Sequence, residues 1–316
     1  MPATELAYQK VNLLMNEMEK VILGKRDVLQ LTVAAFLAGG HVLFEDVPGV
    51  GKTKMVKTLA KATHGQFNRI QFTPDLLPSD ILGVSVYNTA TQQFEFHPGP
   101  IFTTVLLADE INRTTPRSQA ALLEAMSEKH VTIDNHTYPL EENFFVLATQ
   151  NPLEYEGTYP LPEAQLDRFL FKLQIGYPEF SDELNLMLHQ TGHELDHVRQ
   201  VLTASEISQL KQQVEEIYID PKVAQYALQL VHATRNHNGI ELGISPRGSV
   251  SFIKGAKAFA LTEGRNFVIP SDLQQILPAV FGHRLLLKNG YTSSKEHLPE
   301  ILEQILKQVP VPVRKS

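Results

Sequence analysis

Residues 41–53 read His-Val-Leu-Phe-Glu-Asp-Val-Pro-Gly-Val-Gly-Lys-Thr, an apolar run that turns through two glycines and ends on Lys-Thr. Residues 42–44 suit a buried β-strand, and residues 54–62 carry apolar side chains at helical spacing. In a strand, glycine turn and helix of this kind, backbone N–H groups and the positive end of the helix dipole surround a polyphosphate. The stretch therefore predicts a phosphate-binding loop at the edge of a sheet.

Two side chains of this loop have predicted roles toward a nucleotide. Lys52 would reach the β and γ phosphates, and Thr53 would offer its hydroxyl to Mg²⁺. The pattern G-x-x-x-x-G-K-[ST] is matched except at its first position, where Asp46 replaces glycine. That departure leaves the phosphate-contacting part intact. The alternative, a chance Gly-Lys-Thr after a turn, is disfavoured because a strand and a helix flank the loop as the chemistry requires.

Composition restricts the classes of function. At 316 residues the chain is long for one compact core, which favours two domains. The net charge of -7 argues against duplex nucleic acid as the main partner. The absence of cysteine excludes disulfides, thiolate metal sites and a cysteine nucleophile. With no leader-like pattern and no run long enough to span a bilayer, we expect a cytoplasmic protein.

Strands and helices alternate in the first part of the chain. Further strands are expected at residues 67–72, 104–110, 144–149 and 169–175, and hairpins at residues 84–87 with 93–96 and at 131–133 with 136–138. Beyond residue 180 the strand signal disappears, and helices are expected at residues 181–193, 204–216, 221–237, 246–262 and 271–277. We predict an α/β fold with a doubly wound, parallel, five-stranded sheet in residues 1–180 and a small all-α domain in residues 181–316.

Polar residues follow the predicted strands, where ligands collect in open parallel sheets. Asp109 would hold Mg²⁺, and Glu110 would act as general base toward the water that attacks the γ-phosphate. The alternative for this pair is a helix N-cap. Asn151 could orient the same water, because an amide both donates and accepts, although Asn-Pro alone is only a turn signal.

An apolar segment ahead of the loop, at residues 21–24, is a candidate wall for the adenine, with plain core packing as the alternative. The residues predicted to contact the nucleotide are Ile22, Gly24, Asp46, Val47, Pro48, Gly49, Val50, Gly51, Lys52, Thr53 and Lys54.

Six stretches in order along the chain resemble the AAA+ ATPases, and within them the MoxR family. They are residues 45–53 (EDVPGVGKT), 107–113 (LADEINR), 119–126 (QAALLEAM), 148–152 (ATQNP), 161–169 (LPEAQLDRF) and 245–247 (SPR). The resemblance extends from Gly24 to about Arg247, and Asp46 is a frequent variant in that family. It implies an AAA+ core followed by a helical lid.

The resemblance also assigns roles to individual residues. Lys52 and Thr53 look like the Walker A pair, Asp109 and Glu110 like Walker B, and Asn151 like sensor 1. Arg168 looks like an arginine finger, which in this family enters the site of the neighbouring subunit. Arg247 looks like sensor 2, reaching the γ-phosphate from the lid. Guanidinium groups supplied from outside the loop stabilise spread transition-state charge, in agreement with both roles.

Each arginine also has a plainer alternative. For Arg168 it is an ion pair with Asp167, and for Arg247 it is a surface position at the start of a helix. If Arg168 acts in the neighbouring site, oligomerisation is part of the mechanism. The family forms rings, typically hexamers, and a homo-oligomeric ring is therefore predicted here, with Glu163 and Arg113 as candidate interface residues.

The resemblance implies an ATP- and Mg²⁺-dependent remodelling chaperone. The two hairpins resemble pore-facing elements that pull on a protein client. The family's usual partners are proteins with von Willebrand factor A domains, and its usual task is the maturation or metal loading of a client complex. Rival readings are a nucleic-acid motor or transcription activator, which would need a basic face or helix-turn-helix, and a mainly structural nucleotide-binding subunit.

One further motif, at residues 193–197, resembles a zinc-binding pattern. Residues 193–197 read His-Glu-Leu-Asp-His, which fits the zinc-hydrolase pattern H-E-x-x-H, and His189 extends its four-residue spacing. Such a site needs a well-supported helix in a buried cleft with a third ligand. The neighbouring Gly192 and the polar surroundings indicate a solvated helix end instead, and no metal site is predicted here.

Overall fold

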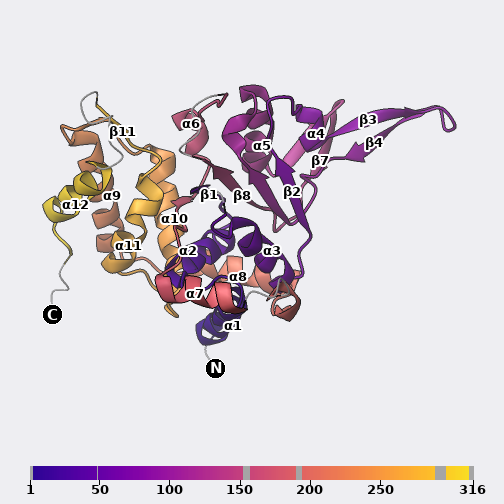
Figure 1. Ribbon diagram of the computed structural model, residues 1–316. Coiled ribbons are helices and arrows are strands. Elements are labelled where there is room, and N and C mark those ends of the chain that lie inside the picture. The colour runs from indigo at the N-terminus through magenta and orange to yellow at the C-terminus, as the bar shows by residue number, and fades with distance from the viewer. Residues whose placement is uncertain (1–2, 48, 152–156, 190–193, 289–296, 313–316) are drawn as a thin grey trace.

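The computed structural model describes residues 3–47, 49–151, 157–189, 194–288 and 297–312. The α/β core and the helical lid lie side by side (Figure 1). The core is built on a five-stranded parallel sheet in the order β2-β5-β8-β1-β9. Its strands are β1 (Val42–Glu45), β2 (Phe67–Gln71), β5 (Val105–Asp109), β8 (Phe145–Gln150) and β9 (Phe171–Leu173). The predicted doubly wound sheet is thus confirmed.

The sheet is buried on both faces, as apolar parallel strands require. Alternate residues of β1 enter different cores: Val42 and Phe44 join one hydrophobic cluster, and Leu43 joins the other. The first cluster is formed with α1 (Ala3–Glu19), α2 (Arg26–Leu37) and α3 (Lys52–Ala62), and the second with α4 (Pro78–Leu82) and α5 (Pro116–Glu128). Helices therefore cover both faces of the sheet. A ligand-binding site is expected at the loops that follow the strands.

Both predicted hairpins are present. One consists of β3 (Gly83–Asn88) and β4 (Gln93–Pro98), and the other of β6 (His130–Ile133) and β7 (His136–Pro139). The β3–β4 hairpin extends far from the body of the protein as an arm (Figure 1). At its base Phe96 stacks on Tyr138 with ring centroids 4.1 Å apart, which joins the two hairpins.

The lid contains α9 (Pro221–Asn236), α10 (Pro246–Thr262), α11 (Pro270–Phe281) and α12 (His297–Gln308), the last of which was not predicted. A two-stranded antiparallel sheet, β10 (Ile240–Leu242) with β11 (Leu286–Leu287), adds strand structure that the helical periodicity did not reveal. These strands are too short to produce an alternating pattern.

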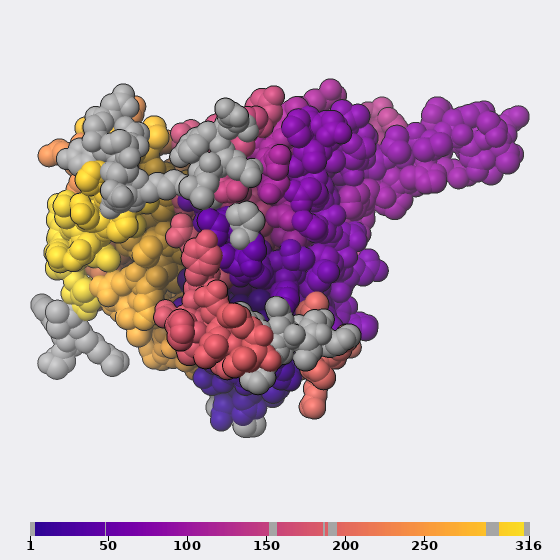
Figure 2. Space-filling view, in the orientation of Figure 1, coloured from indigo at the N-terminus to yellow at the C-terminus, as the bar shows by residue number. Residues whose placement is uncertain are grey.

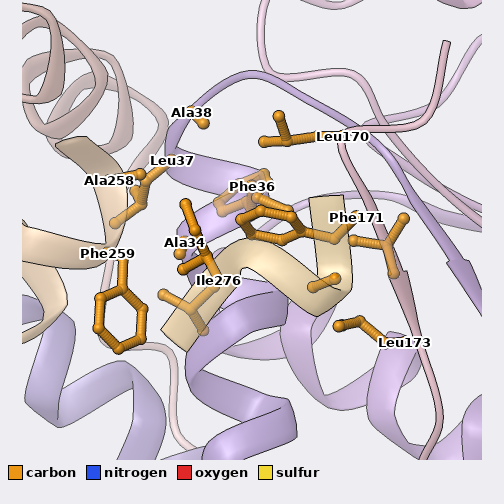
Figure 3. Packing of buried hydrophobic residues seen from close by; sticks show 14 of the residues in the cluster. Ala34, Phe36, Leu37, Ala38, Leu170, Phe171, Leu173, Ala258, Phe259 and Ile276 are labelled. Carbon is orange, nitrogen blue, oxygen red and sulfur yellow. The ribbon is translucent and has the colours of Figure 1, made fainter. Parts of the chain in front are cut away.

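The helical part of the chain is packed firmly on the core. Residues of α2, β9, α10 and α11 interdigitate around Phe171, as Figure 3 shows. Gly255 of α10 permits this approach, because a Cβ there would lie 2.9 Å from the Phe171 ring. Between core and lid, α7 (Phe180–His189), the 3-10 helix η2 (Glu194–His197) and α8 (Ala204–Glu216) follow β9. Among the described residues, no helix has the length and apolar content that a membrane span requires.

Candidate functional site

The phosphate-binding loop lies between β1 and α3, where the motif placed it. Gly49 and Gly51 have φ angles of +88° and +97°, which only glycine adopts readily. Helix α3 begins at Lys52, because the left-handed Gly51 directly precedes it. The N–H groups of Lys52, Thr53 and Lys54 therefore belong to the first helical turn, whose N–H groups precede the regular bonding pattern of the helix.

These groups line a cavity of about 390 Å³ at the carboxyl ends of the strands. Its other lining residues are Asp46, Gly49, Gly51, Arg69, Gln71, Asp109, Glu110, Thr149 and Asn151. The cavity thus brings together the predicted Walker A, Walker B and sensor 1 residues. Asn151 is buried, and its place beside Glu110 goes beyond the simple turn that Asn-Pro alone would indicate.

Asp46, the departure from the loop pattern, has a specific set of partners. Its carboxylate accepts hydrogen bonds from the backbone N–H of Ile175 at 2.6 Å and of Gly176 at 3.1 Å. The side chain is buried, and the main-chain oxygen of Asp46 accepts a 3.0 Å bond from Lys52 Nζ. A glycine here could not tie the loop to the chain that leaves β9, so Asp46 fixes the loop in place.

The two Walker B carboxylates are held differently. Thr149 Oγ1 donates to Asp109 Oδ1 at 2.6 Å, and Arg69 pairs with Asp109 Oδ2 at 2.6 Å. Gln71 Nε2 donates to Glu110 Oε2 at 2.7 Å. Glu110 precedes the 3-10 helix η1 (Ile111–Arg113), yet its side chain makes no capping bond. The N-cap alternative for this pair therefore has no support.

The electrostatics of the cavity favour an anionic ligand. Burial lowers the pKa of Lys52 from its ordinary value, and the carboxylates of Asp46, Asp109 and Glu110 partly offset that shift. A phosphate chain would stabilise the charged lysine further. The Thr53 hydroxyl and the Asp109 carboxylate line the same cavity, and oxygen ligands of this kind fit Mg²⁺, which takes few protein groups and several phosphate or water oxygens.

A smaller cavity of about 130 Å³ adjoins the loop on its other side and shares Gly49, Gly51 and Lys54 with the first. Ile22 and Val50 line this candidate base cavity, and Ile22 is also part of the hydrophobic core, as the alternative of core packing expects. Gly24 lies next to this cavity with a φ of +67°, and a Cβ there would clash with the Asp182 carboxylate. Val47 lines neither cavity, and Pro48 is outside the described residues.

Arg69, Gln71 and Thr149 were missed at the level of sequence. Arg69 and Gln71 point to the same side of β2, since they are two residues apart, and Gln71 pairs in register with Asp109. Thr149 is the fifth residue of β8. A usable signal was present: polar residues at the carboxyl end of an otherwise apolar strand belong with the loop residues that follow it.

Arg168 lies at the amino-terminal ends of the strands, called here the amino edge of the sheet. Its own phosphate loop lies at their carboxyl-terminal ends, the carboxyl edge. Arg168 precedes β9, and the next residues, Leu170 and Phe171, bond to His41 at the amino end of β1. Its guanidinium donates to the Leu123 carbonyl at 2.5 Å and to Ser127 Oγ at 3.0 Å. The Asp167 alternative is wrong, because Asp167 instead pairs with Arg284 at 2.6 Å.

Arg247 lies beside Arg168. It is in the first turn of α10, exposed, and its guanidinium donates to the same Ser127 Oγ at 3.4 Å. Neither arginine lines the nucleotide cavity of its own chain. The structure therefore brings the two predicted arginines together at Ser127, away from the Walker A and Walker B residues of the same chain. The candidate interface residue Arg113 pairs with Glu110 at 3.1 Å, and Glu163 is exposed.

The histidine motif is not presented on one α-helix. His193 is outside the described residues, and residues 194–197 form the 3-10 helix η2 and not an α-helical turn. In the described part of the chain, no group of three or more His, Asp or Glu side chains is arranged to hold a metal.

The fold and the cavity define an AAA+ ATPase class: a phosphate loop and acidic pair on a 2-5-8-1-9 sheet, followed by a helical lid. The model of the ATPase family associated with various cellular activities (AAA) matches residues 41–171, and the AAA lid domain matches residues 232–305.

Proteins that match nearly the whole chain identify its family within this class. It is 50% identical to the uncharacterized protein YeaC of Bacillus subtilis over 94% of this chain and 93% of that protein. It is 38% identical to the chaperone MoxR1 of Mycobacterium tuberculosis over 94% and 81% of the two chains. The crystal structure of a proposed ATPase from Cytophaga hutchinsonii superimposes with a TM-score of 0.89 at 37% identity, covering 98% and 97%. The chain belongs to the MoxR family of AAA+ ATPases.

Proposed function

We propose that the protein hydrolyses ATP within a homo-oligomeric ring and uses the energy to remodel a protein client. The observation that carries this proposal is the separation of the catalytic groups. Lys52, Asp109 and Glu110 share one cavity, whereas Arg168 and Arg247 lie together at the opposite edge of the sheet. Each chain then carries two half-sites, which complete each other only between neighbouring subunits.

Within the cavity, the first-turn N–H groups of α3 and Lys52 would bind the terminal phosphates. Thr53 and Asp109 would hold Mg²⁺, whose contribution is to neutralise charge on the phosphate oxygens. Glu110, positioned by Gln71, would accept a proton from the attacking water, which Asn151 would orient. Ile22 and Val50 would contact the base.

The arginines would act on the next subunit. Arg168 cannot reach its own phosphate loop, because the length of β1 separates the two edges of the sheet. A guanidinium contributed by a neighbour stabilises the charge that develops during phosphoryl transfer. A head-to-tail contact of this type closes into a ring, and a hexamer is the proposed size.

The β3–β4 arm is the proposed client contact. It extends from the body in Figure 1, and Val84, Val86, Tyr87 and Phe94 are exposed on it. Residues 83–98 contain no Lys or Arg, which favours a protein client over nucleic acid. A relative is named as a chaperone. We propose a client complex whose maturation or metal loading involves a von Willebrand factor A domain protein.

Concentration-dependent turnover tests this function. With ATP and Mg²⁺ saturating, turnover per subunit should rise as protein concentration passes through the assembly midpoint measured by sedimentation velocity. Turnover per subunit that stays constant in a chain sedimenting as a monomer would contradict the proposal. Capture experiments with the Glu110→Gln protein, which should bind ATP and stall, would identify the client.

A further inference from the structure

Helix α7 presents an uncovered apolar ridge beside the nucleotide site. The ridge, defined as Phe180, Leu184, Met187 and Leu188, follows helical spacing, and these side chains are 85%, 45%, 79% and 67% exposed. Exposure on this scale in contiguous apolar residues marks an interaction surface. In Figure 2 the helix lies on the surface facing the viewer, with nothing described in front of it.

Acidic residues flank the ridge, and the segment that carries it is joined to the nucleotide site. Glu179 and Glu183 are exposed next to it, and residues 177–189 contain no Lys or Arg. Lys25 Nζ donates to the Tyr177 carbonyl at 2.6 Å, and Pro178 lines the base cavity. The ridge therefore lies beside the half-site that is proposed to bind ATP.

A basic, apolar-walled cavity lies beside the two arginines. This lysine cavity has a volume of about 560 Å³, and Leu37 of α2 and Val250 and Ile253 of α10 supply apolar walls. Four lysines surround it: Lys129, Lys211, Lys254 and Lys257. Val250, 68% exposed, is three residues from Arg247 on α10. The cavity therefore belongs to the half-site that supplies the arginines.

The lysines of the cavity are destabilised in the isolated chain by burial and by their repulsion of one another. Lys211 lies 5.1 Å from the centroid of the Phe36 ring. Burial, and then the positive charge of Lys129, lowers the pKa of Lys211 to about 8; Glu142 opposes this shift and Lys254 adds to it. Burial and Lys129 lower the pKa of Lys254 as well, while Glu215, which also lines the cavity, opposes that shift. Incoming carboxylates would relieve this repulsion.

The ridge and the lysine cavity of one chain cannot meet. Gly24 and Lys25, at the start of α2, contact the α7 region, whereas Leu37, at its end, lines the cavity. The 12 residues of α2 separate the two by about 18 Å at 1.5 Å per residue. Contact between them therefore requires two molecules.

We propose that the α7 ridge of one subunit docks into the lysine cavity of the next copy of this chain. The proposal rests on the ring arrangement proposed above and specifies its contact. Apolar side chains would enter the apolar walls, while Glu179 and Glu183 would face the lysines. Since the ridge adjoins the ATP half-site and the cavity adjoins the arginine half-site, one contact would bring both halves together. It would also couple the base cavity to assembly through Pro178.

Cross-linking tests the contact directly, because the chain contains no cysteine. A chain with Met187→Cys and Val250→Cys, treated with a short thiol cross-linker under ATP in the Glu110→Gln background, should form a ladder of covalent oligomers. Each single-cysteine chain should give no species beyond a dimer. The control pair Met187→Cys with Leu228→Cys uses an exposed position on α9 and should give no ladder.

Charge reversal tests the polar part. Glu183→Lys and Lys254→Glu should each weaken assembly by about tenfold, and the double variant should recover most of the loss. Phe180→Asp and Val250→Asp should each weaken it by at least about tenfold, whereas the exposed control Leu228→Asp should not.

A ring that sediments normally, lacks the ladder and tolerates these variants would overturn the docking contact while leaving the ring function intact. A chain that never assembles, in any nucleotide state, would overturn the contact and the ring together.

Discussion

The two edges of the central sheet differ in what they hold. The carboxyl edge gathers Lys52, Asp109 and Glu110 around one cavity. The amino edge gathers Arg168 and Arg247 around Ser127, next to the lysine cavity. One edge is suited to bind a nucleotide, and the other has the cations that hydrolysis would need. Under the proposed function, a single chain separates nucleotide binding from transition-state stabilisation, and assembly would control turnover.

The largest effect is expected from the amino edge. Arg168→Ala should reduce turnover by about 10³-fold or more, because a guanidinium in this role contributes about 10³ to 10⁵. ATP affinity should change little, since Arg168 does not line its own nucleotide cavity. Steady-state hydrolysis above the assembly midpoint, with ATP binding measured separately, checks this. The exposed Arg199→Ala is the control. Parallel loss of nucleotide binding would place Arg168 in its own site after all.

At the carboxyl edge, Glu110→Gln should reduce turnover by about 10² to 10⁴-fold while ATP binding persists, because general-base assistance is lost but the phosphate loop is not. Single-turnover hydrolysis beside equilibrium nucleotide binding separates the two effects. Turnover close to that of the parent protein would favour the mainly structural role and remove Glu110 from the chemistry.

Asp46 tests how the loop is held. Asp46→Ala should lower the free energy of unfolding by about 1–3 kcal/mol, since the buried N–H groups of Ile175 and Gly176 lose their acceptor. The KM for ATP should rise as the loop loosens. Urea denaturation and steady-state kinetics measure the two effects, with Asp75→Ala, exposed at the surface, as the control. Unchanged stability would mean that other contacts fix the loop.

The smallest effect concerns Lys211. Its folded-state pKa of about 8 is below the ordinary value of 10.5, so between these values the unfolded chain binds more protons and stability should rise with pH. Lys211→Met should remove this rise and, at pH 7, stabilise the isolated chain by about 1 kcal/mol while weakening assembly. Thermal unfolding from pH 7 to 10.5 tests the sign. A destabilised variant that assembles normally would contradict it.

Much of the fold could be predicted from the sequence, because apolar runs ending in Gly-Lys-Thr and Asp-Glu specify strands and their ligand-bearing ends. The same logic placed Asn151 correctly in the cavity. Short strands such as β10, with three residues, could not be predicted, because alternation with a period of two is not visible over that length.

Contacts that depend on register and tertiary packing could not be predicted. Arg69 and Gln71 reach the Walker B carboxylates only because β2 lies next to β5. The pairing of Asp167 with Arg284 joins residues 117 positions apart, so a neighbouring arginine looked like the partner. The place of Arg247 beside Arg168 likewise depends on how the lid packs on the core.

Mixing two inactive variants tests the central claim most directly. Arg168→Ala subunits keep the nucleotide cavity, and Glu110→Gln subunits keep the arginines. In mixed rings with equal amounts of each, about a quarter of the interfaces would pair an intact cavity with an intact arginine. The account predicts that turnover returns to about that fraction of the parent value after mixing. Turnover that stays at the sum of the two separate variants, in rings shown to contain both, would contradict it.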